Sequence, residues 1–152
     1  MDIIDLKILN ILKANARTKA SAIADEIDLS ISAVTERIKK LEQSGIIDQY
    51  TLIVNQKKVG NDIAAVMEVG IDHPRYIDSF INFVKSNPNI ISCYGVAGDY
   101  DFVLHILIDS SEGLESLYRM VRGFEGVKAT KTYIILKTIK NEITLIPESL
   151  AN

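Results

Sequence analysis

Residues 20–44 read ASAIADEIDLSISAVTERIKKLEQS, and this stretch holds two helical patterns with a break between them. The first pattern predicts a short helix from Ala20 through Ile27. Asp28 is expected to end it, because aspartate tolerates the left-handed backbone conformation of a turn. Ser30 is expected to cap the next helix, which spans about Ile31 to Ser44. Two helices separated by a tight turn, after a further helical pattern upstream, form a helix-turn-helix arrangement.

The helix expected at residues 31–44 has an outer face suited to DNA. At about 100° per residue, Val34, Ile38 and Leu41 fall on one stripe that must face the core. The opposite side carries small polar side chains early and cations late, which is the order of a helix whose first turns approach base edges while its cations reach phosphates. A solvated face on a structural helix is the alternative. The candidate DNA-binding residues are Ser32, Ala33, Thr35, Glu36, Arg37, Lys39 and Lys40.

Length and composition restrict the class of protein. The chain has 152 residues, of which 47% are hydrophobic and 24% are charged, and this is the composition of a globular protein. No apolar run approaches the roughly 20 residues of a membrane-spanning helix. The N-terminus lacks a secretory signal, and the single cysteine, Cys93, has no internal disulfide partner. We therefore expect a cytoplasmic protein without a membrane partner.

Charge and hydrophobic period both change near Gly60. Residues 1–60 carry nine Lys/Arg and eight Asp/Glu, net +1, whereas residues 61–152 carry eight and twelve, net −4, and the two sum to the formal charge of −3. Helical spacing dominates the front, and strand-like runs begin at Ile63. An anionic partner is therefore expected at the front. The predicted domains are a helix-turn-helix domain at 1–50, an extended linker at 51–60 and a second domain at 61–152.

The second domain is expected to follow the order βαββαβ. The predicted strands are Ile63–Ile71, Ile90–Val96, Phe102–Ile108 and Val127–Ile139, and the predicted helices run from Pro74 to Asn87 and from Glu112 to Gly123. This order predicts a ferredoxin-like fold, an antiparallel sheet with two helices on one face, so the fold class is α+β. The other face stays uncovered although its strands carry apolar residues. An exposed patch of this kind marks an interface, and we expect a homodimer paired sheet to sheet.

The sequence contains no arrangement typical of an enzyme or a metal site. Cys93, His73 and His105 have no partner at the spacing of metal ligands or of a nucleophile and its base. A glycine loop that binds phosphate is also missing from the sequence. We therefore expect no catalysis, no cofactor and no metal.

Two signatures resemble the Lrp/AsnC (feast/famine) family of transcriptional regulators. The signatures are Asp5 with Lys7-Ile8-Leu9, Ala16-Arg17, Ile23-Ala24, Leu29-Ser30, Arg37-Ile38-Lys39-Lys40-Leu41-Glu42, Gly45-Ile46-Ile47 and Tyr50 in the front domain, and Gly98-Asp99-Tyr100-Asp101 in the second. The resemblance covers nearly the whole chain. It implies an N-terminal DNA-binding domain, a C-terminal amino-acid-responsive domain, dimers formed through that domain and octamers of four dimers. Lys19 stands where the family often has a Ser/Thr helix cap, which makes Thr18 the expected cap.

The resemblance also makes the turn at residues 98–101 the expected binding site for a small amino acid. A zwitterion needs an anion for its ammonium group and hydrogen-bond donors for its carboxylate. One of the two turn carboxylates supplies the anion, and backbone amides of the turn with threonine hydroxyls on the last strand supply the donors. Which carboxylate points inward stays open. The expected effector-binding residues, placed between protomers, are Gly98, Asp99, Tyr100, Asp101, Thr130 and Thr132.

Three functions remain open at this point. The predicted one is a sequence-specific DNA-binding transcriptional regulator that is modulated by an amino-acid effector. An architectural DNA-binding protein would discriminate little between sites, whereas specific binding is about 10³ to 10⁷ tighter than non-specific binding. An amino-acid-sensing module that regulates an enzyme would show no salt-dependent affinity for double-stranded DNA.

Overall fold

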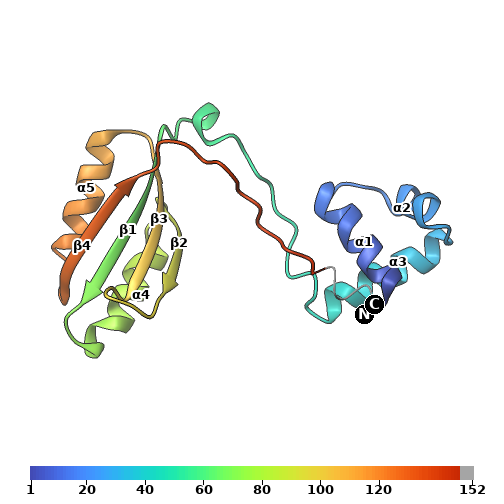
Figure 1. Cartoon of the computed structure of the whole chain (residues 1–152), viewed down its shortest axis with the longest axis horizontal. Helices are drawn as coiled ribbons and strands as arrows, with labels where there is room; N and C mark the ends of the chain where they lie inside the picture. Colours follow the sequence, from blue (N-terminus) through green and yellow to red (C-terminus); the bar gives the residue numbers. More distant parts are fainter. Residues whose placement is uncertain (148–152) are drawn as a thin grey trace. The chain divides into compact units, whose positions relative to one another are not determined.

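The computed structural model describes residues 1–147, which form two compact units (Figure 1). The first unit contains Met1–Ile53 together with the described residues from Lys140 onward, and the second unit is Val54–Ile139. In the first unit, the ammonium of Lys13 lies 3.7 Å from the carboxylate of Glu142. The described residues from Lys140 onward therefore group with the first unit, whereas the predicted second domain runs from residue 61 to residue 152.

The first unit is built from three helices. They are α1 (Ile3–Ala14), α2 (Ala20–Ile27) and α3 (Ile31–Gln43). Asp28 adopts the left-handed conformation expected of it, with φ of 63°, and the hydroxyl of Ser30 accepts a hydrogen bond from the backbone N–H of Ala33 at 3.2 Å. The predicted turn and the predicted N-cap of α3 are therefore confirmed.

The N-cap of α2 is Lys19, so the expectation that Thr18 caps this helix is wrong. The hydroxyl of Thr18 instead donates to the carbonyl of Asn15 at 2.7 Å, in the turn that follows α1. This hydrogen bond holds Thr18 in the preceding turn. The side chain of Lys19 makes no capping bond.

The core of the first unit lies where the three helices meet. Its buried residues come from all three helices and include the Val34 and Leu41 stripe predicted for α3. These residues are Ile8, Leu12, Ile23, Ala24, Val34 and Leu41. Because α3 turns this stripe inward, its opposite side remains at the surface.

Residues 51–60, predicted to be an extended linker, are not extended throughout. Gln56–Val59 forms a short 3₁₀ helix, η1. The side chain of Asn55 caps it by accepting from the N–H of Lys58 at 3.2 Å. Gly60 ends it with φ of 92°, a conformation that glycine adopts without steric cost.

The second unit has the predicted ferredoxin-like topology. Its elements are β1 (Ile63–Ile71), η2 (Pro74–Tyr76), α4 (Ile77–Ser86), β2 (Ile90–Gly95), β3 (Phe102–Ile108), α5 (Ser111–Arg122) and β4 (Val127–Ile134). All paired strands are antiparallel, and the sheet order is β2-β3-β1-β4. The fold class α+β is therefore confirmed, with a short 3₁₀ turn at Pro74 before α4.

The last strand is shorter than predicted. β4 ends at Ile134, whereas the apolar run predicted a strand to Ile139. Its partner β1 starts at Ile63, and the last bond between them runs from the N–H of Ile135 to the carbonyl of Ala64 at 2.8 Å. Beyond this point the strand has no neighbour to pair with in the sheet, and Ile139 is 83% exposed.

The core of the second unit fills the space between the sheet and its two helices. Phe80 of α4 is fully buried, and its ring centroid lies 5.2 Å from that of Phe102 and 5.6 Å from that of Phe124. Met67 of β1 and Leu104 of β3 are also fully buried on this side. Alternate residues of a strand point to opposite faces. The residues that flank Met67 in β1 and Leu104 in β3 therefore lie on the uncovered face.

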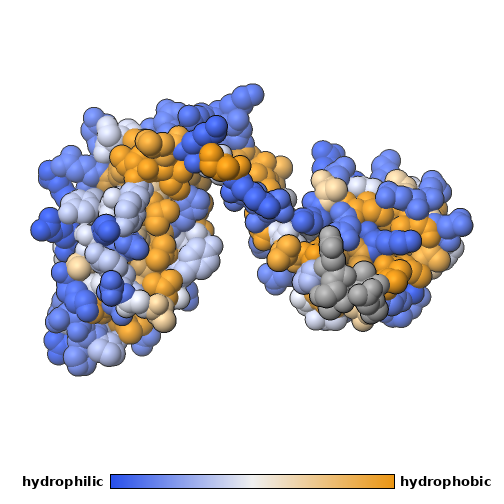
Figure 2. All heavy atoms as spheres, viewed as in Figure 1, coloured by the Kyte–Doolittle hydropathy of each residue, from blue (hydrophilic) through white to orange (hydrophobic). Residues whose placement is uncertain are grey.

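The uncovered sheet face combines apolar and polar side chains. Val66, Val103 and Leu107 are only half-buried there, and Tyr94 and Tyr133 are exposed. Figure 2 shows apolar side chains reaching the surface of the second unit among polar ones. Within residues 1–147, no helix is long and apolar enough to cross a membrane.

Candidate functional site

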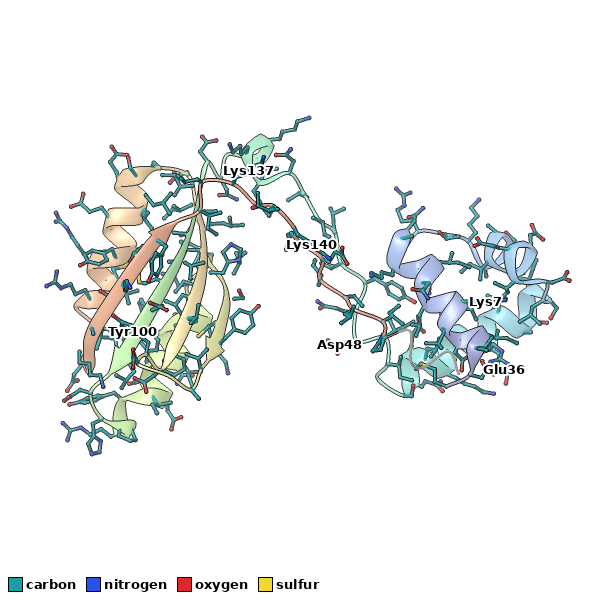
Figure 3. All side chains as sticks on the ribbon, viewed as in Figure 1. Lys7, Glu36, Asp48, Tyr100, Lys137 and Lys140 are labelled. Atoms are coloured by element: carbon teal, nitrogen blue, oxygen red, sulfur yellow. The ribbon has the colours of Figure 1, made fainter. Side chains whose placement is uncertain are left out.

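The surface side of α3 carries the side chains that the sequence analysis selected for DNA. Ser32, Glu36, Lys39 and Lys40 are exposed, whereas Ala33, Thr35 and Arg37 are half-buried on the flanks. Figure 3 shows Glu36 pointing away from the helical core of the first unit. The structure thus brings four of the seven candidates onto one accessible strip.

Glu36 and Lys40 form an ion pair along this strip, with Oε1 and Nζ 2.9 Å apart. The hydrogen bond from Lys40 lowers the pKa of the Glu36 carboxyl, so the side chain is a carboxylate at neutral pH. Both side chains are more than two-thirds exposed, and an exposed pair at this spacing contributes little to stability. The pair can therefore open when a partner approaches.

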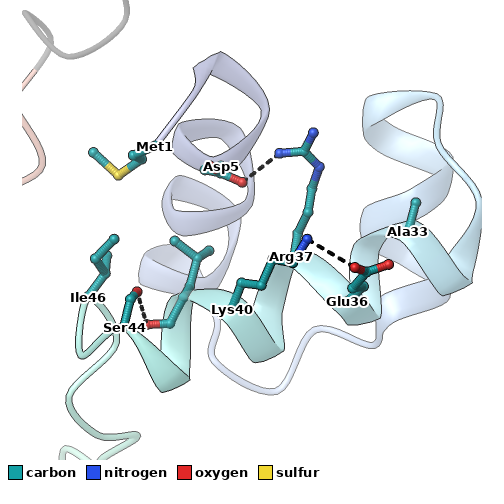
Figure 4. A pocket seen from close by; sticks show the side chains of 9 residues that line it. Met1, Asp5, Ala33, Glu36, Arg37, Lys40, Ser44 and Ile46 are labelled. Atoms are coloured by element: carbon teal, nitrogen blue, oxygen red, sulfur yellow. Dashed lines mark hydrogen bonds and ion pairs between the residues drawn. The ribbon is translucent and has the colours of Figure 1, made fainter.

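Arg37 is engaged within the first unit. Its Nη1 donates to Oδ2 of Asp2 and to Oδ1 of Asp5, each at 2.8 Å, and these two acids also form the capping box of α1. Figure 4 shows the guanidinium directed at Asp5. The predicted DNA contact of Arg37 rested on its positive charge and its position along α3. In the structure it joins α3 to the beginning of α1.

A groove of about 550 Å³ lies between α3 and the beginning of α1 (Figure 4). Ala33, Glu36 and Lys40 line it from α3, and Met1 and Asp5 line it from the N-terminal side. The groove therefore extends the accessible strip of α3 toward α1. Arg37 forms the boundary between the two helices.

Arg37→Met is expected to destabilise the first unit at neutral pH and to lose this effect in acid. A bond from the N–H of Asp5, followed by the Arg37 guanidinium, lowers the pKa of Asp2 below its ordinary 3.8. A carboxyl whose pKa is lowered by folding stabilises above its unfolded pKa, and the stabilisation is lost as pH falls through the folded value. Urea unfolding from neutral pH to below 3.8 should show the wild-type and variant free energies converging.

The matched control for this measurement is Arg17→Met, which changes an exposed arginine of the same unit. Arg17 has no ion pair among residues 1–147, so its replacement should leave stability unchanged at every pH. A difference between wild type and Arg37→Met that persists unchanged in acid would contradict the role of the Asp2 contact.

The turn at residues 98–101 joins β2 to β3 and is fastened by Asp101. Oδ2 of Asp101 accepts from the N–H of Ile71 at 2.6 Å, and its own N–H donates to the carbonyl of Val69 at 3.0 Å. Its carbonyl accepts from the N–H of Val96 at 2.9 Å. Asp101 thereby connects the turn to the end of β1. Asp99 is exposed and makes none of these bonds.

Thr130 and Thr132 lie on the helix-covered side of β4. Thr130 is opposite Val69 and Thr132 is opposite Met67, and directly paired residues of neighbouring strands share a face. Oγ1 of Thr132 is buried without a hydrogen-bond partner among residues 1–147. β1 lies between β4 and β3 in the sheet. Within the described residues, these hydroxyls therefore make no hydrogen bond to the turn at residues 98–101 of the same chain.

The uncovered sheet face holds a polar cluster that sequence reasoning missed. The Tyr133 hydroxyl lies 3.4 Å from Oε2 of Glu68, and the Lys131 ammonium lies 5.1 Å from the Tyr133 ring centroid. Tyr133 first, and then Glu68 and Tyr100, raise the pKa of Lys131. The two-residue period of β4, which puts Thr130 and Thr132 on one face, was the signal that places Lys131 and Tyr133 on the other.

The described residues contain no cluster of metal ligands, and the one cysteine among them is not activated. Within residues 1–147, no group of three His, Cys, Asp or Glu side chains is arranged to hold a metal ion. Burial raises the pKa of the Cys93 thiol, which disfavours the reactive thiolate.

Comparison with known families gives two matches, one for each unit. Residues 64–145 match the family described as Lrp/AsnC ligand binding domain, and residues 1–48 match the family described as winged helix-turn-helix DNA-binding. These are the parts of the chain that carry the ferredoxin-like fold and the three helices.

Similar proteins match over nearly the full chain. The HTH-type transcriptional regulator FL11 of Pyrococcus furiosus is 36% identical over 147 residues, covering 97% of this chain and 96% of FL11. LrpC of Bacillus subtilis is 34% identical over 139 residues, covering 91% and 94%. Among solved structures, a Neisseria meningitidis transcriptional regulator in complex with L-Met has a TM-score of 0.92 at 26% identity, covering 97% of each chain.

Proposed function

Since this chain belongs to the Lrp/AsnC family and is a ligand-modulated, DNA-binding transcriptional regulator, we propose that it reads specific DNA sites with α3 and responds to a small amino acid. The accessible strip of α3 is the observation that carries the first part. The exposed carboxylate at the turn of residues 98–101 supports the second.

In the proposed complex, α3 lies in the major groove of double-stranded DNA. Its buried stripe packs on the other two helices, so the strip with Ser32 and Glu36 faces base edges. Ala33 and Thr35 flank these contacts. Lys39 and Lys40 lie further along and reach phosphates, while Arg37 acts as a positioning residue that fixes the angle of α3 against α1.

Glu36→Ala is expected to change base preference at one or two positions by about 1 to 3 kcal/mol each, because a carboxylate accepts from the cytosine amino group. Lys40→Ala should weaken binding to all sequences alike and lower the salt slope by about one ion. The measurement is binding to a randomised site library and to one duplex over a range of salt. Lys85→Ala, an exposed lysine of α4, is the matched control and should change neither quantity.

Because Glu36 and Lys40 form an ion pair, the double variant is needed to separate their effects on DNA binding. If the pair opens on DNA, the two single effects should add in Glu36→Ala/Lys40→Ala, because the residues then act on different parts of the duplex. A sequence-selective Lys40→Ala together with a silent Glu36→Ala would show that this docking is wrong.

The proposed functional unit is a homodimer joined through the uncovered sheet face of the second unit. This face leaves Val66, Val103 and Leu107 partly exposed, which is typical of an interface. Two helix-turn-helix domains then read two half-sites about 34–36 Å apart, or a multiple of that distance. Octamers of four such dimers are the proposed higher assembly, as in the family resemblance.

The proposed effector site is completed between protomers. Asp101 is bound to Ile71, so Asp99 is the carboxylate that meets the effector ammonium, and amides near Gly98 meet its carboxylate. Tyr100 forms a wall. Because β4 is an edge strand of the sheet, we place Thr130 and Thr132 of a neighbouring protomer as the source of the hydroxyls. The L-Met complex of the Neisseria protein supports an amino acid as the ligand class.

We further propose that the protein is cytoplasmic, has no catalytic activity and needs no cofactor. Its relatives are named as transcriptional regulators. An architectural role would give a specificity ratio near one in the site-library measurement, whereas the proposed regulator gives a ratio of about 10³ or more.

A further inference from the structure

A second groove, of about 390 Å³, lies in the second unit at the end of the sheet where β1 begins and β3 ends. The turn at residues 98–101 is at the other end, where β3 begins. Ile108 and Leu117 are buried below the groove, and Met120, which is 51% exposed, forms its rim. The volume falls in the lower part of the range of small-molecule sites, which is about 300 to 1,000 Å³.

Two asparagines on the groove wall each donate one amide N–H to a neighbouring oxygen of the same chain. Nδ2 of Asn89 donates to the carbonyl of Leu107 at 3.1 Å, and this bond fixes the orientation of the amide because a carbonyl only accepts. Nδ2 of Asn61 donates to Oε1 of Gln56 at 2.9 Å. The side-chain oxygens of both asparagines therefore remain as acceptors.

A carboxylate joins these oxygens at the first turn of α5. Oδ1 of Asp109 accepts from the hydroxyl of Ser110 at 3.0 Å, and the groove reaches Asp109. A Cβ at Gly113 would lie 2.8 Å from this oxygen and 3.0 Å from the Ile108 side chain. Glycine at this position is what lets the carboxylate and the apolar floor lie against the same helical turn.

We propose that this groove binds a small primary ammonium ion with a short alkyl body. The walls offer the carboxylate of Asp109 and the two asparagine oxygens, and none of the lining residues is a cation. An ammonium group has three donors and no acceptor, so it matches such a wall where a carboxylate ligand would not. The alkyl body packs on Ile108, Leu117 and Met120. This site is separate from the turn at residues 98–101 and does not depend on DNA binding.

The test is saturation-transfer difference NMR on the full-length protein with n-butylammonium as the probe and butyrate as its anionic counterpart. Wild type should transfer saturation to n-butylammonium and not to butyrate. Asp109→Asn keeps the shape and removes the charge, so the signal should be lost, whereas Glu112→Gln removes an exposed carboxylate of the same helix that does not line the groove and should keep it. Ser116→Leu, which fills the groove from α5, should also abolish the signal.

Equal signals from wild type and Asp109→Asn would overturn the proposal, and so would no signal at high millimolar probe or an equal signal from butyrate. Far-UV circular dichroism of each variant checks that it is folded, and Ser116→Leu gives an independent result if Asp109→Asn is not. Asp99→Ala should keep the n-butylammonium signal. Loss of that signal in Asp99→Ala would assign the amine to the turn and also overturn the proposal.

Discussion

Val66→Glu is expected to separate the dimer and to lower affinity for a two-half-site operator by about 10²- to 10³-fold. Val66 lies near the centre of the uncovered sheet face, between His105 of β3 and Tyr133 of β4. In the proposed dimer this carboxylate is removed from water in both protomers, and taking a charge out of water costs several kcal/mol. A single helix-turn-helix domain then binds each half-site on its own, without the gain from simultaneous binding.

The protomer itself should stay folded in Val66→Glu. The neighbours Ala65 and Met67 point into the core, so the substitution leaves the helix-covered face unchanged. Light scattering measures the mass, and operator titration measures the affinity. Asn82→Glu, on the exposed side of α4, adds the same charge away from the face and should remain dimeric. A dimeric Val66→Glu with wild-type operator affinity would place the dimer interface elsewhere.

Asp99→Ala is expected to abolish amino-acid binding and, with it, the effect of the amino acid on DNA affinity. Coupling between an effector and a second ligand is typically about 1 to 3 kcal/mol, which corresponds to a change of roughly 5- to 150-fold in affinity. Loss of Asp99 leaves the ammonium group without its anion. The fold should be unaffected, because the Asp99 side chain is exposed and is not the one bound to β1.

Asp101→Ala is the comparison variant, because it removes the other carboxylate of the same turn. It leaves the N–H of Ile71 without its acceptor, which should destabilise the second unit by about 1 to 3 kcal/mol. Calorimetric titration of all twenty amino acids against wild type and both variants measures binding, and thermal unfolding measures stability. If an amino acid binds wild type and Asp99→Ala equally well, the ammonium partner is not Asp99. If no amino acid binds wild type, the proposed amino-acid response is wrong and the protein is an effector-independent member of the family.

Local signals made the helix-turn-helix predictable at the level of single residues. Asp28 and Ser30 act on backbone atoms within a few residues of themselves, so the local sequence is enough to predict their effects. The role of Arg37 could not be read this way. Its acceptor Asp2 is 35 positions away, and only the packing of α1 against α3 brings the two side chains together.

The strands also differ in whether local sequence or pairing with a distant strand determines them. The ranges of β1 and β3 followed from their own apolar runs, whereas the end of β4 depends on where its partner strand begins. The face of Thr130 and Thr132 also required the register with β1. β4 is an edge strand whose residues are exposed or half-buried on both faces, and such a strand gives a weak alternation of hydrophobic residues.

The return of the chain to the first unit affects how C-terminal truncations of this protein are interpreted. The first unit joins residues 1–53 to the described residues from Lys140 onward, so its contacts are complete only when the segments on both sides of the second unit are present. Deletions that reach residues 140–147 therefore remove part of the first unit. Loss of DNA binding on trimming the C-terminus would consequently report damage to the N-terminal unit and would not locate a DNA contact in the tail.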